Sequence, residues 1–264
     1  MNVKLKSEEK KAHTIQSVDR AIDILEVFGD GRNELGVTEI SKLLGLHKST
    51  TFGLLTTLEV RGYLEKNVVT GKYQLGLKLF ELGNQVQNGM ELKRVADQYL
   101  EQLLAENGET VHLVIMDDGE AIYIDKKEGP ESMRMVSQVG KRLPMHCSGV
   151  GKTLLAHLPE IEINKIICKK GLPGLTAKTI TEPEALFEEL KRIREQGYAL
   201  DNEEISEGLM CVAAPIRNYS GQVMAALSVA GPTVRMNGEK IEEVKESVLR
   251  VCNAISCRLG YKQA

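Results

Sequence analysis

The stretch from residue 36 to residue 67, GVTEISKLLGLHKSTTFGLLTTLEVRGYLEKN, constrains the fold more than any other part of the chain. Its first part places apolar residues on one side of a short predicted helix, which Gly45 ends as a C-terminal capping glycine does. A second helix is predicted from Lys48 to Arg61, and Gly62 ends it. Two short helices joined by a tight glycine turn are the pattern of a helix-turn-helix.

The flanks of this pattern carry further signals. Thr38 is the predicted N-cap of the first helix, with Val37 before it as a possible hydrophobic staple. Two short runs at 63–66 and 72–75 are joined by a turn at Thr70-Gly71, which predicts a β-hairpin. The stretch therefore predicts a winged helix-turn-helix.

The second helix of such a motif enters the major groove of DNA by its N-terminal end. Small hydroxyl groups there can contact phosphates or base edges, and cations at the helix end and in the hairpin can hold the flanking backbone. The net charge of −3 excludes a chain that binds DNA by overall charge, so the prediction depends on where the charges lie. The alternative is that the hydroxyls cap the helix and the cations are solvated surface. The predicted DNA contacts are Thr38, Lys48, Ser49, Thr50, Thr51, Arg61 and Lys72.

Phe52 and Gly53 stand in the middle of this predicted reading surface. Phe52 is either a core residue or a groove residue in contact with a thymine methyl group, and the pattern favours the core. Gly53 costs about 0.5–1 kcal/mol against alanine inside a helix. Few base-reading side chains remain, so we expect specificity to rest on Lys48, the hydroxyls and DNA shape.

The rest of the chain divides by changes in its periodicity. The charged segment 1–13 is a predicted disordered tail without the apolar centre of a signal peptide, followed by the DNA-binding domain at 14–76. A linker helix is predicted at 77–92 and an effector domain at 93–264, whose strands connect mainly through hairpins and so favour an antiparallel sheet. One of its candidate strands is 134–139. Since no apolar run reaches the ~18 residues of a membrane helix, we expect a cytoplasmic protein that binds no membrane.

The segment HCSGVGKTLLA at 146–156 resembles the end of a nucleotide-binding phosphate loop. That loop requires glycine six residues before its lysine, and with Lys152 as the lysine the position is His146. The preceding residues GKRLPMH are also wrong for a buried strand. Nucleotide binding is therefore disfavoured, but the start of a helix at Ser148 still presents amides that suit a small carboxylate.

The chain resembles the IclR family of transcriptional regulators over essentially its full length. The resemblance rests on SVDRAIDILEVF, VTEISKLLGLHKSTTFGLLTTLEVRGYLEK, GKYQLGLKLFELG, GYALDNEEISEGLMCVAAPI and AALSVAGP. It implies an α+β protein of two domains, in which a winged helix-turn-helix and a linker helix precede a GAF-like α/β effector domain. It also implies a homodimer or homotetramer that binds palindromic double-stranded operator DNA.

The resemblance further implies an effector pocket in the C-terminal domain. Backbone amides near Gly149 would hold an acid group there, while side chains of the sheet line the wall. Ala230 stands where some relatives have a second serine, which removes one hydrogen bond to the effector. The implied effector contacts are Gly149, Val150, Asp201, Cys211 and Ser228.

These observations predict a ligand-responsive repressor that senses a small organic acid, a 2-keto or hydroxy carboxylate of the kind derived from sugar acids. An alternative is a redox-active thiol enzyme that uses Cys147 and Cys211, and another is an architectural DNA binder without an effector. No base, nucleophile and orienting group stand at recognisable spacing, so no catalytic residue is predicted. His146 with the same two thiols could bind zinc if the three converge, but no fixed spacing supports a metal, and no cofactor is predicted.

Overall fold

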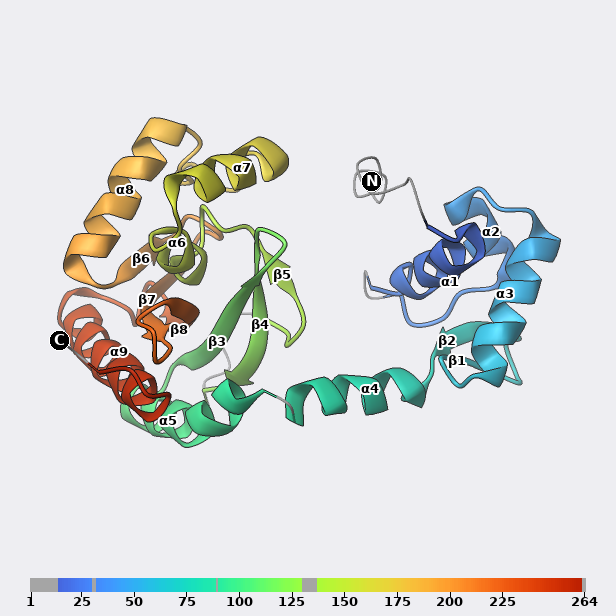
Figure 1. The fold of residues 1–264 in the computed structure, drawn as a ribbon, viewed down its shortest axis with the longest axis horizontal. Coiled ribbons are helices and arrows are strands. Elements are labelled where there is room, and N and C mark those ends of the chain that lie inside the picture. Colours follow the sequence, from blue (N-terminus) through green and yellow to red (C-terminus); the bar gives the residue numbers. More distant parts are fainter. Residues whose placement is uncertain (1–13, 30–31, 89, 130–136, 263–264) are drawn as a thin grey trace. The chain divides into compact units, whose positions relative to one another are not determined.

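A computed structural model describes residues 14–29, 32–88, 90–129 and 137–262 (Figure 1). Contacts within the chain separate two compact units, Met1–Gly89 and Met90–Ala264. The predicted tail at 1–13 lies outside the described residues. None of the described helices is long and apolar enough to cross a membrane.

The N-terminal unit has the two helices of the helix-turn-helix and the hairpin expected from the sequence. Its core is made by apolar residues of the first three helices together with Leu64 and Tyr73 of the hairpin. The hairpin strands pair antiparallel with Glu65 opposite Gln74, and Leu35 adds one bridge to Tyr73. The elements are α1 (Gln16–Glu26), α2 (Val37–Leu44), α3 (Lys48–Val60), β1 (Leu64–Lys66), β2 (Tyr73–Leu75) and α4 (Leu77–Asn88).

The two ends of α2 show one correct and one wrong prediction. Gly45 ends the helix in the left-handed conformation (φ 65°), and its N–H donates to the Ser41 carbonyl. The prediction of Thr38 as N-cap is wrong, because α2 begins at Val37 and Gly36 is the N-cap. The Glu39 side chain accepts from the Gly36 N–H at 2.7 Å, so a glutamate reaching back satisfies the start of the helix in place of a threonine hydroxyl.

The C-terminal unit contains a six-stranded sheet in the order β5-β4-β3-β8-β7-β6, and every pairing between these described strands is antiparallel. This confirms the expected sheet type. The candidate strand at 134–139 falls mostly outside the described residues, and its described part, 137–139, is not a strand. The strands are β3 (Thr110–Asp117), β4 (Glu120–Lys127), β5 (Arg142–Leu143), β6 (Ala199–Asn202), β7 (Leu209–Arg217) and β8 (Val223–Pro232).

Helices cover both faces of this sheet (Figure 1). One face packs against α5 (Glu91–Asn107) and α9 (Gly238–Arg258). The other carries α6 (Gly149–Leu155), which contacts β6, β7 and β8, with α7 (Glu160–Lys170) and α8 (Pro183–Gln196) beyond it. α4 ends at Asn88 and α5 begins at Glu91, so the linker helix predicted at 77–92 corresponds to α4 and the start of α5.

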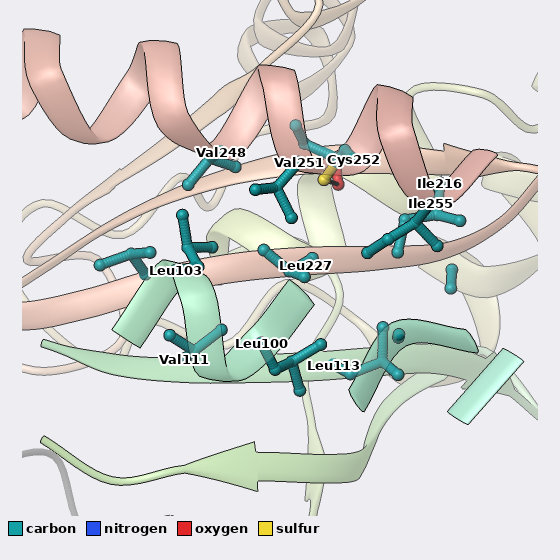
Figure 2. Packing of buried hydrophobic residues seen from close by; sticks show 14 of the residues in the cluster. Leu100, Leu103, Val111, Leu113, Ile216, Leu227, Val248, Val251, Cys252 and Ile255 are labelled. Atoms are coloured by element: carbon teal, nitrogen blue, oxygen red, sulfur yellow. Dashed lines mark hydrogen bonds between the residues drawn. The ribbon is translucent and has the colours of Figure 1, made fainter. Parts of the chain in front are cut away.

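The core between α5, α9 and the sheet uses alternate residues of each strand (Figure 2). Val111 and Leu113 of β3 and Leu227 of β8 meet Leu100 of α5 and Val251 of α9 in this layer. Because side chains alternate along a strand, the residues between them point to the opposite face, under α6. His112 and Ser228 are such residues, and both are buried there.

Candidate nucleic-acid interface and effector site

The recognition helix α3 turns one side to the core and the other to solvent. Thr51, Leu55 and Leu58 are buried at helical spacing. Lys48, Ser49 and Thr50 at the start of the helix are all exposed. These three predicted DNA contacts are therefore available to a ligand at the end of the helix that enters the groove.

Thr51 does not fit its predicted role as a DNA contact. Its exposed fraction is 0%, and its hydroxyl donates to the His47 carbonyl at 3.1 Å. The pattern STT offers no reason to separate this residue from the two before it. The spacing to Leu55 and Leu58 provides that reason, because i, i+4 and i+7 share one helical face.

The prediction that Phe52 belongs to the core is wrong, since 53% of this residue is exposed. Phe52 follows Thr51 in the helix, so its side chain is rotated by about 100° from the buried side of α3. Leu55 and Leu58 fill the core that Phe52 was expected to reach. A Cβ atom at Gly53 would have no neighbour within 4 Å, so this glycine also faces open space.

The other predicted contacts surround this helix. Thr38 is exposed in the first turn of α2, and Arg61 is exposed immediately after α3. Lys72, between the hairpin turn and β2, forms an ion pair with Glu39 of α2 (3.2 Å), and both side chains are partly exposed. This pair fixes the hairpin against α2 and offsets the positive charge of Lys72.

The candidate effector site lies where α6 meets the sheet. Ser148 is the N-cap of α6, and its hydroxyl oxygen accepts from the Gly151 N–H at 3.1 Å while the hydroxyl donates to the Pro144 carbonyl at 3.0 Å. Gly149 and Val150 are the first two residues of the helix, so their amides have no acceptor within it. The predicted helix start is thus correct, and all of its residues are buried.

Gly149 packs closely against the sheet. A Cβ atom added there would lie 2.6 Å from Cys211 Sγ and 3.5 Å from the Asp201 nitrogen. Asp201 and Cys211 are directly opposite each other on β6 and β7. The structure therefore brings together three of the predicted effector contacts that are far apart in the sequence.

Ser228 lies on the same face, one strand further along the sheet. It pairs with Ala213 of β7, whose Cβ would be 3.4 Å from a Cβ at Gly149. On its other side it pairs with His112 of β3. Gly149, Asp201, Cys211 and Ser228 thus lie in one buried region where α6 meets the sheet, and Val150 follows Gly149 in the helix.

Burial sets the charge of Asp201. It raises the pKa of this carboxyl to about 7, and the nearby Glu204 acts in the same direction. The Glu204 N–H, which donates to Asp201 Oδ1 at 2.8 Å, and the Lys152 ammonium lower the pKa but do not cancel the effect. Asp201 therefore titrates near neutral pH inside the site.

Lys152 and Glu204 form a pair that no sequence pattern predicted. Lys152 is 1% exposed, and its Nζ lies 2.5 Å from Glu204 Oε1 and 3.3 Å from Glu189 Oε1. Among the described residues, the buried Glu204 Oε2 atom has no hydrogen-bond partner. The motif at 146–156 suggested Lys152 only as a phosphate ligand. A lysine that is buried in an otherwise apolar helix needs an anionic partner, and the motif did not indicate one.

His112 and Tyr123 were also not predicted from the sequence. Their ring centroids are 4.7 Å apart, and His112 Nε2 lies 2.8 Å from Ser137 Oγ. Burial, assisted by Lys126, lowers the pKa of His112 to about 3, so the ring is neutral at ordinary pH. Burial raises the pKa of Tyr123, and Cys211 and Asp201, where they are ionised, act in the same direction. The only sequence signal was a histidine at an alternate position of an apolar strand.

The thiols of the redox alternative are buried. Burial raises the pKa of Cys147 to about 12, and it also raises the pKa of Cys211 although the amides of Gly149 and Asp201 act against it. Both are protonated at neutral pH and are poor nucleophiles.

The third residue of the zinc hypothesis is His146. Its Nε2 atom lies 3.0 Å from the Pro173 carbonyl oxygen, and the residue lines a separate cavity of about 230 Å³ beside α7. In the part of the chain that the structure describes, no three His, Cys, Asp or Glu residues are grouped to hold a metal ion.

The helix-turn-helix with its hairpin and the buried polar region of the second unit together define a DNA-binding transcriptional regulator. Residues 17–68 match the family model for the IclR helix-turn-helix domain, and residues 84–257 match that for the bacterial transcriptional regulator IclR C-terminal domain. The chain belongs to the IclR family of transcriptional regulators.

Individual relatives agree over nearly the whole chain. The HTH-type transcriptional regulator XynR of Escherichia coli is 41% identical over 94% of this chain and 98% of its own length. The transcriptional repressor IclR of the same organism is 34% identical over 93% of this chain and 90% of its own length. The crystal structure of an IclR homologue complexed with 4-hydroxybenzoate, from Microbacterium hydrocarbonoxydans, matches with a TM-score of 0.81 and 28% identity, covering 92% of this chain and 98% of that one.

Proposed function

We propose that the chain is an effector-responsive repressor, in which a small organic acid binds beneath α6 and changes operator affinity. The observation that carries the proposal is the convergence of Gly149, Asp201 and Cys211, with Ser228 one strand away, in one buried polar region. A relative named as a repressor and a similar fold complexed with a carboxylic acid support both parts of it.

The chemistry of the region favours an acid that also carries a keto or hydroxyl group. The α6 amides at Gly149 and Val150 and the positive end of the short helix favour a carboxylate. Asp201 and Ser228 lie beyond them and can exchange hydrogen bonds with a polar group further along the effector. A 2-keto or hydroxy acid of sugar-acid type combines both features.

Operator binding requires two copies of α3. Since a palindromic site presents two half-sites, a homodimer or homotetramer would place one recognition helix on each. An effector changes operator affinity only if it binds one arrangement of the copies more tightly than another. In this proposal the C-terminal unit senses the effector and the N-terminal unit reads the operator.

A thermal-shift series with 2-keto acids, hydroxy acids and the matching neutral amides tests the sensor. We expect one class of acid to raise the melting temperature and to change affinity for a selected operator duplex, whereas its amide does neither. Ser228→Ala should weaken that response without loss of the fold, because it removes one hydroxyl from a buried wall. If every acid left both melting temperature and operator affinity unchanged, the sensor proposal would be wrong.

Asp201 should give the C-terminal unit a specific pH dependence. Its folded-state pKa of about 7 exceeds the ordinary value of 3.8, so the folded state binds this proton more tightly than the unfolded chain. The stabilisation is complete below about pH 4 and is lost as the pH rises through 7, by at most about 1.4 kcal/mol per pH unit. The free energy of unfolding is measured by denaturation at a series of pH values for the wild type and for Asp201→Asn. We expect the difference between the two free energies to fall with this slope and to become constant above about pH 8.

The charged and titratable neighbours of Asp201 are Glu204, Lys152, Tyr123, Cys211 and Cys147. Burial raises the pKa of Glu204 as well, but this residue is present in both proteins and largely cancels in the difference. A hydrogen bond altered by the amide of the variant would add a constant offset without a slope. A pH-independent difference between pH 4 and pH 8 would contradict the prediction.

A further inference from the structure

The outward side of α3 offers few of the groups that usually read bases. Between Lys48 and Val60 the helix contains no Arg, Asn or Gln, the side chains that form paired hydrogen bonds with guanine or adenine. Lys48 is its only cation, at the first position. Glu59, its only acid, is near the other end. The middle of the helix must therefore read DNA by another kind of contact.

The hydroxyls of the middle turns are already engaged. Thr56 Oγ1 donates to the Phe52 carbonyl at 2.9 Å, and Thr57 Oγ1 donates to the Gly53 carbonyl at 2.9 Å. Both threonines are exposed. With their donors used inside the helix, these side chains present methyl groups and acceptor oxygens to a ligand.

Phe52 completes an apolar surface at this position. It is 53% exposed and takes no part in the hydrophobic cluster of the N-terminal unit. Lys48, Phe52 and Thr56 follow one another at intervals of four residues, so they line one side of the helix. Gly53 beside them has no side chain and open space around it, which allows a base edge to approach the backbone.

We propose that the Phe52 ring and the Thr56 methyl group read the 5-methyl groups of thymines in the major groove of the operator. Apolar contact with phenylalanine or a threonine methyl is a known way to distinguish thymine from the other bases. The inference rests on the proposed function, since it assumes that α3 enters the groove. It assigns specificity to Phe52, while Lys48 at the helix start adds a contact to the phosphate backbone or a guanine.

The test compares thymine with uracil, which lacks only the methyl group. Full-length protein selects a duplex from a randomised library, and that duplex is then synthesised with deoxyuridine at every thymidine. We expect the uracil duplex to bind about fourfold more weakly for each contacted methyl, the ratio that burial of one methyl group provides. The selected duplex should carry thymines at symmetric positions in both half-sites.

Three variants separate methyl reading from other effects. Phe52→Ala should reduce the ratio of the two affinities to the part that the Thr56 methyl group provides, and Phe52→Leu should restore some of the lost difference. Lys48→Ala should weaken both duplexes alike and leave the ratio unchanged, because neither a phosphate contact nor a guanine contact depends on the methyl group of thymine. As a further control, Val60→Ala removes another exposed apolar side chain, at the far end of α3, and should change neither affinity nor ratio.

The outcomes distinguish this inference from the proposed function. If the wild type binds both duplexes equally, or if Phe52→Ala keeps the wild-type ratio, methyl reading is wrong although DNA binding stands. If no duplex is selected above background, the DNA-binding function and the inference both fall. If Phe52→Ala instead changes the oligomeric state at unchanged thymine preference, the exposed ring belongs to a contact between chains and the inference is overturned.

Discussion

Replacing Lys152 with methionine is expected to lower the free energy of unfolding by about 3–5 kcal/mol, because it leaves buried carboxylates without their cation. Lys152 Nζ is held between Glu204 and Glu189, and Glu204 already has one buried oxygen without a partner among the described residues. The chain has no tryptophan, so far-UV circular dichroism during urea unfolding of the full-length protein is the measurement.

Lys169→Met is the matched control for this variant. Lys169 carries the same charge in α7 and pairs with Asp118, but both side chains are largely exposed, and exposed ion pairs contribute about 0–1 kcal/mol. Adding Glu204→Gln to Lys152→Met should recover part of the loss, because it removes the uncompensated charge. A Lys152→Met protein as stable as the control variant would show that the buried pair does not stabilise the fold.

Gly149→Ala is expected to destabilise the C-terminal unit by about 1–3 kcal/mol, the usual cost of forcing an extra group into a packed interior. The new Cβ would lie 2.6 Å from Cys211 Sγ, which is itself buried and backed by the sheet. We also expect the effector response to be lost, because relief of the clash separates α6 from β7. Urea unfolding and the acid thermal-shift series measure the two effects.

Cys211→Ala provides the second half of this test. It removes the sulfur that the new methyl group meets, so the double variant should be more stable than Gly149→Ala alone. Gly53→Ala is the control for glycine replacement in a helix, since its Cβ meets nothing and alanine should stabilise by about 0.5–1 kcal/mol. Equal losses in Gly149→Ala and in the double variant would place the strain elsewhere.

The reading elements of the protein could be predicted from the sequence because local rules govern them. Helix spacing, Gly45 as a cap and the turn at 70–71 act within a few residues, and the structure has the helices and hairpin that they indicate. The antiparallel sheet was likewise expected from hairpin connections. The position of the glycines relative to Lys152 was enough to disfavour a nucleotide-binding loop. It did not reveal what the lysine contacts.

Local pattern predicted the helix start at Ser148, but the rest of the site was implied only by the resemblance. Gly149, Asp201 and Cys211 are brought together by strand pairing and by the docking of α6, which no spacing along the chain reports. The Lys152 pair with Glu204 joins residues 52 positions apart, and a charge pattern read along the sequence contains no sign of it. Long-range packing decides such contacts, because burial selects which of many charged residues must find a partner.

The sequence by itself predicted the winged helix-turn-helix and the antiparallel sheet, since periodicity and capping residues are local properties of the chain, and its resemblance to the IclR family implied the class of protein. Only the tertiary structure decided that Phe52 faces solvent while Thr51 is buried, and that Lys152 pairs with carboxylates. The physical reason is the same for all three residues. Each can be part of its helix whether its side chain faces the core or the solvent. The core around Leu55 in one unit and the buried carboxylates in the other settled the choice.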